Sequence, residues 1–387
     1  MKVLFINRLM GIRRGGGEYF DYYVAKELQK LGCSIEFVIG KKLTGDFYKL
    51  DEFKTVYITT PYLRDIHYKY CESKWRIIRK IASICLEVDL YLFEKKVLNY
   101  LKKIVNDKPD IIELCGLPRL GSWIEKELRI PTVIEWHGIP SKSNIKWAKK
   151  CAGHIAIGDA FYKVRELINK DSLEIFPGVD TELFTRKNDS SFKKSLGLPD
   201  DGVVFIFVGR LIPIKNIGFL LLGFYEAIKE NNKIFLLIVG DGPERKKIER
   251  FLNTKRGLKE KVKLCGYVNR EIIPYYYSAS DVFVICSNYE SFSLVTLEAM
   301  SCELPIIATK VGFLPQIVKE FENGLLVENN NVLQLKNAIL KLANSLELRK
   351  EIGRRNRRKV IQNFSWYVTA NRLLNFYKKI YERGVTT

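Results

Sequence analysis

The sequence lacks several features that would place it in a familiar class. No stretch approaches 18 uncharged apolar residues, so we expect no helix that spans a membrane. The apolar start, residues 1–6, ends at Asn7 and Arg8 and is too short for a signal peptide. Only three histidines occur, and no two have the HxxH spacing of a zinc site, so we expect no bound metal.

Signs of a disulfide framework are absent as well. Eight cysteines occur, but no two form a CxxC pair, and several lie within apolar runs, as Cys85 and Cys286 do. A chain of 387 residues can bury a core without disulfide bonds. We therefore expect reduced, buried cysteines and a cytoplasmic protein.

Acidic residues are few relative to basic ones. Lys and Arg number 64 and Asp and Glu number 44, which leaves a formal net charge of +20. An excess of this size favours anionic partners: nucleotide phosphates, nucleic acid or an acidic membrane surface. With 47% hydrophobic and 28% charged residues, the chain can form ordinary cores and wholesale disorder is excluded.

Short apolar runs alternate with amphipathic stretches in both halves of the sequence. Such runs, with helices between them, predict parallel sheets that helices cover on both faces. The expected strands are 2–6, 35–39, 56–58, 111–114, 132–135 and 154–157 in the first half, and 203–208, 234–239, 262–264, 282–285, 306–308 and 325–327 in the second. The sequence therefore predicts an α/β protein with two doubly wound, Rossmann-like domains.

The polar segment 185–201 contains few apolar residues and is expected to link the two domains. The predicted boundaries are then 1–184 for the first domain and 185–364 for the second. A final helical segment covers 365–387.

Residues 64–105 interrupt the alternation in the first half. Basic and aromatic residues come first, and an apolar run, 77–92, follows. A basic amphipathic helix of this kind can lie on an anionic bilayer. The other interpretation is a helical pair that covers the sheet and has a solvated outer face.

Two loops of the second half carry residues suited to phosphate. Arg210 and Lys215 follow the strand 203–208, and ligands of open α/β sheets bind at the carboxyl ends of strands. Arg210 offers a planar fork and Lys215 a point charge, although a solvated loop would look the same. Gly240 begins a glycine turn after 234–239, but Arg245 stands where a dinucleotide fingerprint needs its third glycine.

Two carboxylates follow the strand 282–285. Glu290 lies in a loop and Glu298 in the next helix, at a separation of about 10 Å from the helical rise. That distance is too long for a shared proton and suits two acids that hold different hydroxyls of one ligand. The start of the helix can bind an anion, and Ser291 or Ser293 can cap it.

The first half offers two weaker signals. The loop Gly15-Gly16-Gly17 follows the first strand and opens a helix, where a backbone can approach a pyrophosphate. His137 follows the strand 132–135 at a carboxyl end, and a lone histidine there is more often structural.

An ordered set of motifs spans nearly the whole chain. The motifs are GGGE (15–18), WHG (136–138), PGVD (177–180), VGRLIPIKN (208–216), IVGDGPE (238–244), GYV with YYYSASDVFV (266–284), ESFSLVTLE (290–298), NGLLV (323–327) and NFSW (363–366). The set resembles the retaining GT-B glycosyltransferases of the family that includes sucrose synthase and phosphatidylinositol mannosyltransferases (family four, group 1). The resemblance implies two domains facing across a cleft, with a last helix that crosses back to the first domain.

The resemblance also implies roles for single residues. Arg210 and Lys215 would bind the diphosphate of a nucleotide sugar, Glu290 would contact the donor sugar, and His137 would lie near the reacting carbon. The residues implied in the rest of the donor site are Gly16, Gly17, Gly240, Tyr267, Val268, Phe292, Ser293, Leu294 and Glu298. Among these, Glu298 would hold the ribose and Tyr267 and Val268 the base.

The implied activity is metal-independent, retaining transfer of a hexosyl group. The donor would be a nucleoside-diphosphate sugar, such as a UDP- or GDP-hexose, and the acceptor a hydroxyl of a glycan, a lipid-linked sugar or a small sugar. No further cofactor and no nucleic acid are expected, and 64–105 would contact the inner membrane face peripherally. Two alternatives stay open: a GT-B relative acting as epimerase or hydrolase, and a basic membrane- or nucleic-acid-binding protein that is not an enzyme.

Overall fold

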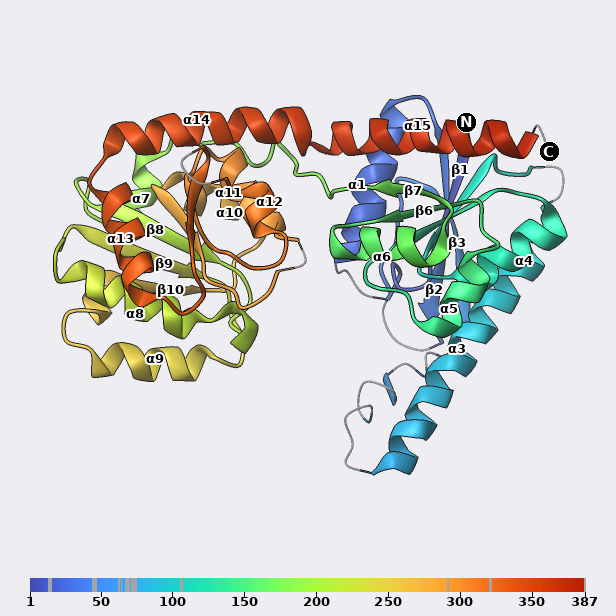
Figure 1. Cartoon of the computed structure of the whole chain (residues 1–387), viewed down its shortest axis with the longest axis horizontal. Helices are drawn as coiled ribbons and strands as arrows, with labels where there is room; N and C mark the ends of the chain where they lie inside the picture. The colour runs from blue at the N-terminus through green and yellow to red at the C-terminus, as the bar shows by residue number, and fades with distance from the viewer. Residues whose placement is uncertain are drawn as a thin grey trace. The chain divides into compact units, whose positions relative to one another are not determined.

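The structure, a computed structural model, divides the chain into two compact units. Unit 1 comprises Met1–Phe176 and Trp366–Thr387, and unit 2 comprises Pro177–Ser365 (Figure 1). The described residues are 1–12, 16–43, 47–61, 63, 65–66, 70, 75–104, 107–290, 292–319 and 322–385.

Unit 1 contains a sheet of seven parallel strands in the order β3-β2-β1-β4-β5-β6-β7. The strands are β1 Lys2–Asn7, β2 Ser34–Lys42, β3 Lys54–Thr60, β4 Ile111–Cys115, β5 Thr132–Trp136, β6 Gly153–Ala156 and β7 Asp171–Glu174. Strands β1, β4 and β5 are almost entirely buried, as expected for a sheet that helices cover on both faces.

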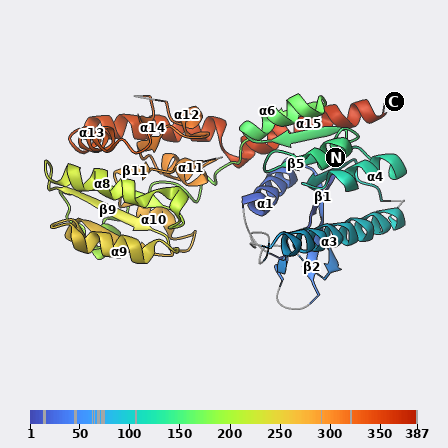
Figure 2. The ribbon, with the colours of Figure 1, turned by 60° about the horizontal axis from the view of Figure 1, so that its bottom comes forward.

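The helices of unit 1 form a layer on each face of this sheet. They are α1 Gly16–Lys30, α3 Arg76–Lys103, α4 Pro118–Leu128, α5 Lys142–Ala148, α6 Asp159–Ile168 and α15 Trp366–Val385. Helices α1 and α15 bury Phe20, Trp366 and Tyr377 in one core, whereas α3 and α4 bury Phe93 and Leu120 in the other. Figure 2 shows α3 and α15 on opposite sides of β1.

Unit 2 contains a sheet of six parallel strands in the order β10-β9-β8-β11-β12-β13. The strands are β8 Val203–Val208, β9 Ile234–Val239, β10 Val262–Gly266, β11 Val282–Ile285, β12 Ile306–Thr309 and β13 Gly324–Val327. The strand order reverses between β8 and β11, and open α/β sheets bind ligands outside the carboxyl ends of strands at such a point.

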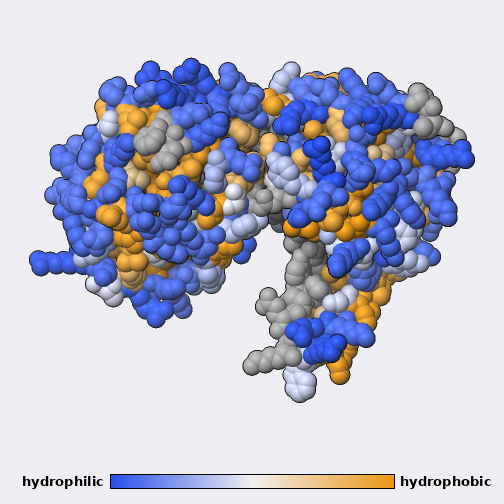
Figure 3. Space-filling model, viewed as in Figure 1, coloured by the Kyte–Doolittle hydropathy of each residue, from blue (hydrophilic) through white to orange (hydrophobic). Residues whose placement is uncertain are grey.

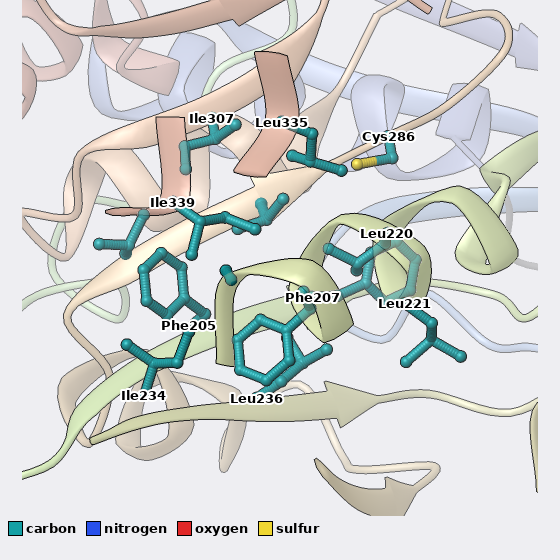
Figure 4. Packing of buried hydrophobic residues seen from close by; sticks show 14 of the residues in the cluster. Phe205, Phe207, Leu220, Leu221, Ile234, Leu236, Cys286, Ile307, Leu335 and Ile339 are labelled. Carbon is teal, nitrogen blue, oxygen red and sulfur yellow. The ribbon is translucent and has the colours of Figure 1, made fainter. Parts of the chain in front are cut away.

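Helices also cover both faces of this second sheet. They are α7 Ser190–Ser195, α8 Ile217–Ile228, α9 Arg245–Thr254, α10 Ile273–Ser278, α11 Leu294–Ser301, α12 Leu314–Ile317, α13 Val332–Ala343 and α14 Leu346–Asn363, with 3-10 turns at Pro213–Lys215 and Lys259–Lys261. Phe205 and Phe207 of β8 pack among Leu236, Leu335 and Ile339 in the core (Figure 4). The predicted α/β class with two Rossmann-like sheets is confirmed.

The segment predicted as a linker lies inside unit 2. The division between the units falls between Phe176 and Pro177, before this segment begins. Within it, the carboxylate of Asp189 caps α7 by accepting hydrogen bonds from the amides of Ser191 and Phe192. Leu198 is buried, so local capping and one apolar anchor order a stretch that is otherwise polar.

Candidate functional site

Two loops meet at the point of unit 2 where the strand order reverses. Lys215, in the loop after β8, forms an ion pair with Glu290, in the loop after β11. The same loops share a hydrogen bond from the Asn288 amide to the Ile214 carbonyl at 2.8 Å. The side chains of Asn216 and Asn288 add a second bond at 3.0 Å. The loops are therefore fixed against each other before any ligand binds.

Glu290 is nearly buried and is held by one of its two carboxylate oxygens. Its Oε1 accepts from Lys215 and, at 2.7 Å, from the hydroxyl of Ser287. Its backbone carbonyl accepts from the Phe313 amide at 2.9 Å. Within the described residues no hydrogen bond reaches Oε2, so this oxygen can accept one from a ligand hydroxyl.

Glycines bring the ends of three neighbouring strands into contact. A Cβ atom on Gly240 would lie 1.9 Å from the carbonyl oxygen of Gly209, and φ of Gly240 is +131°. The Gly240 amide donates to the Gly266 carbonyl at 2.7 Å. Gly240 thus joins the loops after β8, β9 and β10, and Tyr267, which is exposed, follows directly.

The start of helix α11 lies beside Glu290 in the sequence and has no side-chain cap. The expectation that Ser293 caps the helix is wrong, because its hydroxyl instead accepts a bond of 2.8 Å from Thr296. Ser291, the other candidate, lies outside the described residues. Backbone N–H groups of the first turn, which begins at Leu294, therefore stay available to an anion. The ring of Phe292 packs on Phe313, with centroids 5.2 Å apart.

Glu298 lies one turn further along α11 and is buried. Its Oε1 is 2.8 Å from the guanidinium of Arg270, and the hydroxyl of Tyr277 lies 3.5 Å from Oε2. Burial raises the pKa of Glu298 to about 7, although Arg270 acts in the opposite direction. The sequence argument did not include Arg270. It could have been found as a cation two positions after Val268, in the loop that was expected to hold the base.

Arg210 is the second cation of unit 2, after Lys215, that was predicted to bind phosphate. Its side chain is exposed, and it forms no ion pair with any residue that the structure describes. A guanidinium in this state keeps its five donors for an anionic ligand. Val268 is half-buried beside Tyr267. Unit 2 therefore carries Arg210, Lys215 and the predicted base residues on loops that leave one edge of its sheet, and the predicted ribose residue, Glu298, on helix α11.

The residues predicted in the first half lie in unit 1. Helix α1 begins at Gly16, and a Cβ atom on Gly17 would lie 2.4 Å from Nε2 of His137, so the helix start packs on this ring. Gly15 lies outside the described residues. The side chain of His137 is 38% exposed, and its Nε2 is 3.3 Å from Sγ of Cys115 and 3.3 Å from a carboxylate oxygen of Glu135.

A cluster of buried acids that the sequence argument missed lies behind His137. It consists of Asp21 on α1, Glu113 on β4 and Glu135 on β5, whose oxygens lie within 4.8 Å of one another. Burial and repulsion from Glu135 raise the pKa values of Asp21 and Glu113 well above the usual range. Burial likewise raises the pKa of the Cys115 thiol. The available signal was the alternation Glu113-x-Cys115 and Glu135-x-His137, which places four polar side chains on one sheet face.

No helix within the described residues combines the length and apolarity needed to cross a bilayer. The seven cysteines in this part of the chain are all free thiols. The expectation of buried thiols holds for Cys33, Cys151, Cys286 and Cys302, whereas Cys85, Cys115 and Cys265 are half-buried.

Comparison with known proteins gives a family match for part of the chain and similar proteins over most of it. Residues 188–359 match the family model described as "Glycosyl transferases group 1". An uncharacterised glycosyltransferase of Methanocaldococcus jannaschii is 29% identical over 363 residues, 90% of either chain. A UDP-Gal:alpha-D-GlcNAc-diphosphoundecaprenol alpha-1,3-galactosyltransferase of Escherichia coli is 29% identical over 77% of this chain and 82% of its own.

Solved structures share the fold at low identity. Sucrose-phosphate synthase of Thermosynechococcus elongatus aligns with a TM-score of 0.74 and 20% identity, over 99% of this chain and all of the other. The Anabaena protein HepE, solved in complex with UDP, aligns with a TM-score of 0.73 and 20% identity over the full length of both chains. Residues 188–359 therefore form a group 1 glycosyltransferase domain, and the chain is a glycosyltransferase with the GT-B fold that takes its sugar from a nucleotide-sugar donor.

Proposed function

We propose that the protein moves a hexosyl group from a UDP-sugar to a hydroxyl acceptor with retention of anomeric configuration. The observation that carries this proposal is the Lys215–Glu290 pair at the reversal point of the unit 2 sheet. Each member satisfies the other while no ligand is bound, and each matches one half of a nucleotide sugar. Lys215 suits the diphosphate, and Oε2 of Glu290 suits a sugar hydroxyl.

The reaction follows from the charges at this edge of the sheet. The bond between the anomeric carbon and the phosphate oxygen breaks, and the acceptor oxygen forms the new bond on the same face. The acceptor proton passes to the departing phosphate oxygen, so no protein nucleophile is needed. Arg210, Lys215 and the start of α11 stabilise the charge that grows on the diphosphate. The implied roles of Gly16, Gly17 and His137 stay predictions from the resemblance.

Two relatives support the choice of uridine and of a lipid-linked acceptor. HepE was solved with UDP, and the name of the Escherichia coli relative specifies UDP-Gal and a diphosphoundecaprenol acceptor. In this chain, Tyr267 and Val268 would receive the base, and Glu298 the ribose. The acceptor would then lie at a membrane surface.

Helix α3 supports this acceptor class through its first half. One face carries Ile77, Ile81, Ile84, Val88 and Tyr91, at helical spacings of four, three, four and three, and all five are exposed. Figure 3 shows hydrophobic surface along one side of this projecting segment. The second half of α3 packs on the sheet. We therefore apply the membrane interpretation to the first half of the helix, and the interpretation of a helix that covers the sheet to the second half.

Cations lie next to the exposed stripe of α3. Arg76, Arg79 and Lys80 are all exposed within its first two turns. Apolar side chains flanked by cations match the interface of a bilayer that contains anionic lipids. We propose that the first half of α3 attaches the protein peripherally to the cytoplasmic face of such a membrane.

The transfer is tested with a panel of UDP-, GDP- and ADP-sugars and lipid-linked acceptors. We expect turnover with a UDP-hexose and a product whose anomeric configuration, read by NMR, equals that of the donor. Lys215→Met should lower kcat by about 10²- to 10³-fold, because one pre-placed charge on the leaving group is lost. Lys229→Met, which removes an exposed lysine directly after α8, is the matched control and should leave kcat unchanged.

Inversion, hydrolysis without transfer, or epimerisation of the donor would each contradict the proposed reaction. Wild-type turnover of the Lys215→Met variant would contradict the site.

Membrane attachment is tested by co-sedimentation with vesicles of phosphatidylcholine, with and without phosphatidylglycerol. We expect binding only to vesicles that contain the anionic lipid. The double variant Ile77→Asp/Ile81→Asp should reduce the bound fraction at least tenfold, because two charges enter the apolar stripe. Leu333→Asp, at an exposed leucine of unit 2, should have no effect. Equal binding of the double variant would exclude α3 as the anchor.

A further inference from the structure

The buried carboxylate of Glu135 lies against a ring nitrogen of His137. Its Oε2 is 3.3 Å from Nε2 of His137, and the side chains of the two residues are 2% and 38% exposed. Apart from this contact, neither oxygen of Glu135 has a hydrogen-bond partner within the described residues. A buried carboxylate is costly unless donors reach it, so the N–H of a neighbouring ring is a valuable partner for Glu135.

The other two acids of the cluster can carry protons instead of charge. Within the described residues, no lysine or arginine forms an ion pair with Asp21 or Glu113. Burial and repulsion from Glu135 raise the pKa values of both well above the usual range. A protonated Asp21 can donate a hydrogen bond to Glu135 while its Oδ2 accepts one from Asn7 at 2.7 Å. The negative charge of the cluster is therefore best placed on Glu135, which donors can reach from two sides.

The topology of unit 1 explains why Glu135 and His137 meet. Glu135 lies on β5, and His137 follows it by two positions, so both side chains point to the same face of the sheet. Cys115, the register partner of Glu135 on β4, joins them there. Helix α1 covers this face and contributes Asp21.

Cys115 offers His137 a second partner, and the two partners require different forms of the ring. Sγ of Cys115 also lies 3.3 Å from Nε2. A thiol that donates to Nε2 leaves the proton of a neutral ring on Nδ1, whereas a carboxylate that accepts from the ring requires the proton on Nε2.

The strengths of the two bonds decide between these forms. Burial raises the pKa of the Cys115 thiol, so the group stays an S–H, which is a weak donor. A hydrogen bond from N–H to a carboxylate is charge-assisted and about twice as strong as a neutral one. The contact with Glu135 therefore determines which ring nitrogen of His137 carries the proton.

We propose that Glu135 is a positioning residue that holds the proton of His137 on Nε2 and fixes the orientation of the ring. Nδ1 of the neutral ring is then an acceptor and can receive a hydrogen bond from a ligand hydroxyl. The effect on catalysis rests on the proposed function, in which His137 would lie near the donor sugar. A ring of the other form would offer an N–H at Nδ1, and a ring without Glu135 would lose its anchor.

Nitrogen NMR of the histidine-labelled full chain reads this form of the ring, because protonated and unprotonated ring nitrogens differ strongly in chemical shift. The chain contains three histidines, and the His137→Asn variant identifies the signals of His137. His154 is an internal reference. Its Nδ1 accepts from the indole of Trp136 at 3.2 Å, and burial lowers its pKa to about 4, so its neutral ring carries the proton on Nε2.

At pH 8.5, well above the ordinary pKa of histidine, we expect wild-type His137 to show the same pattern as His154. In Glu135→Gln, an amide that can donate to Nε2 replaces the carboxylate, so at least half of the His137 population should change to the form protonated on Nδ1. Glu113→Gln removes the same group from the neighbouring strand of the cluster and should leave the pattern unchanged. A wild-type ring protonated on Nδ1 or on both nitrogens, or an unchanged ring in Glu135→Gln, would overturn the proposal.

Transfer from the UDP-hexose that the wild type uses then shows whether Glu135 acts through His137. Glu135→Gln should lower kcat about 10- to 100-fold, because small errors in placing a group beside the reacting atoms cost up to about 10²-fold. The double variant Glu135→Gln/His137→Asn should be no slower than His137→Asn, since two residues that act through one group are not additive. A full further loss in the double variant would overturn the proposal. A wild type that transfers no sugar would contradict the proposed function, whereas the NMR pattern of His137 would still decide for or against Glu135.

Discussion

The acids at the candidate site of unit 2 and those behind His137 in unit 1 differ in whether a cation is paired with them. In unit 2, Glu290 is paired with Lys215 and Glu298 with Arg270. In unit 1, Asp21 and Glu113 have no ion pair within the described residues, and Glu135 has only His137. The acids of the unit 2 site are therefore balanced by cations of the same unit, whereas the cluster of Asp21, Glu113 and Glu135 holds an excess of negative charge that protons or a cation must offset.

The paired acids of unit 2 are also suited to an exchange of partners. A diphosphate can take over Lys215, and the hydroxyls of a sugar can then occupy Glu290. Such an exchange replaces one charge-assisted hydrogen bond by another, so each group stays satisfied through binding. The pairs therefore keep the site ordered at small cost to donor affinity.

The comparison predicts opposite effects of removing one acid from each unit. At pH 8, Glu113→Gln should raise the melting temperature, because it removes a carboxyl whose ionisation the cluster resists. Glu290→Gln should lower the melting temperature, because Lys215 loses its charged partner. Each effect corresponds to about 1–3 kcal/mol, and 1 kcal/mol shifts the melting of a unit of this size by about 2–4 °C.

The pH dependence of folding stability gives the direction of the effect expected for Glu113→Gln. A raised pKa means that the folded protein holds a proton that the unfolded chain releases near pH 4.5, so this group costs stability increasingly as pH rises above that value. The advantage of Glu113→Gln should therefore grow from pH 5 to pH 8. The ionisable groups of the same cluster are Asp21, Glu135, Cys115 and His137, and Glu18 at the start of α1 lies close enough to act on Cys115. If Glu113→Gln and Glu290→Gln shifted the melting temperature in the same direction, the proposed difference between the two groups of acids would be wrong.

Much of this arrangement could be predicted from the sequence. Apolar runs located nearly every strand, and the motif order placed Lys215 and Glu290, which are 75 positions apart, in one site. Strand β7 was missed because Asp171, Ser172 and Glu174, three of its four residues, are polar and the strand is half-buried at a sheet edge, so no apolar run marks it. Helices were expected between the strands, but the sequence argument gave no bounds for α4, α5 and α6.

The acid cluster could not be predicted, because it depends on which strands are neighbours. The sequence shows Glu113 and Cys115 on one strand and Glu135 and His137 on another, but only the pairing of β4 with β5 brings them together. The choice of Arg270 as the partner of Glu298 depends similarly on how the loop after β10 folds over α11. Pairing of distant elements is a property of the fold and is not encoded at any one position.

A smaller effect is expected at the second pair of unit 2. Glu298 has a pKa of about 7 and accepts hydrogen bonds from ribose hydroxyls best as a carboxylate. Raising the pH from 6 to 8 should therefore increase affinity for UDP-glucose about tenfold and then have no further effect. UDP-glucose suits the measurement because its diphosphate is a diester, whose charge does not change between pH 6 and pH 8.

The Glu298→Gln variant should bind UDP-glucose more weakly at pH 8 and with no dependence on pH, since the titrating group is gone. Glu226→Gln, at an exposed glutamate of α8 that pairs with Lys229, should keep the tenfold rise. Calorimetry at three pH values measures both. A rise that survives in Glu298→Gln would assign the titration to another group, and the pair with Arg270 would then be structural only. A rise that disappears would show that the donor takes over a buried acid that Arg270 holds in the free enzyme.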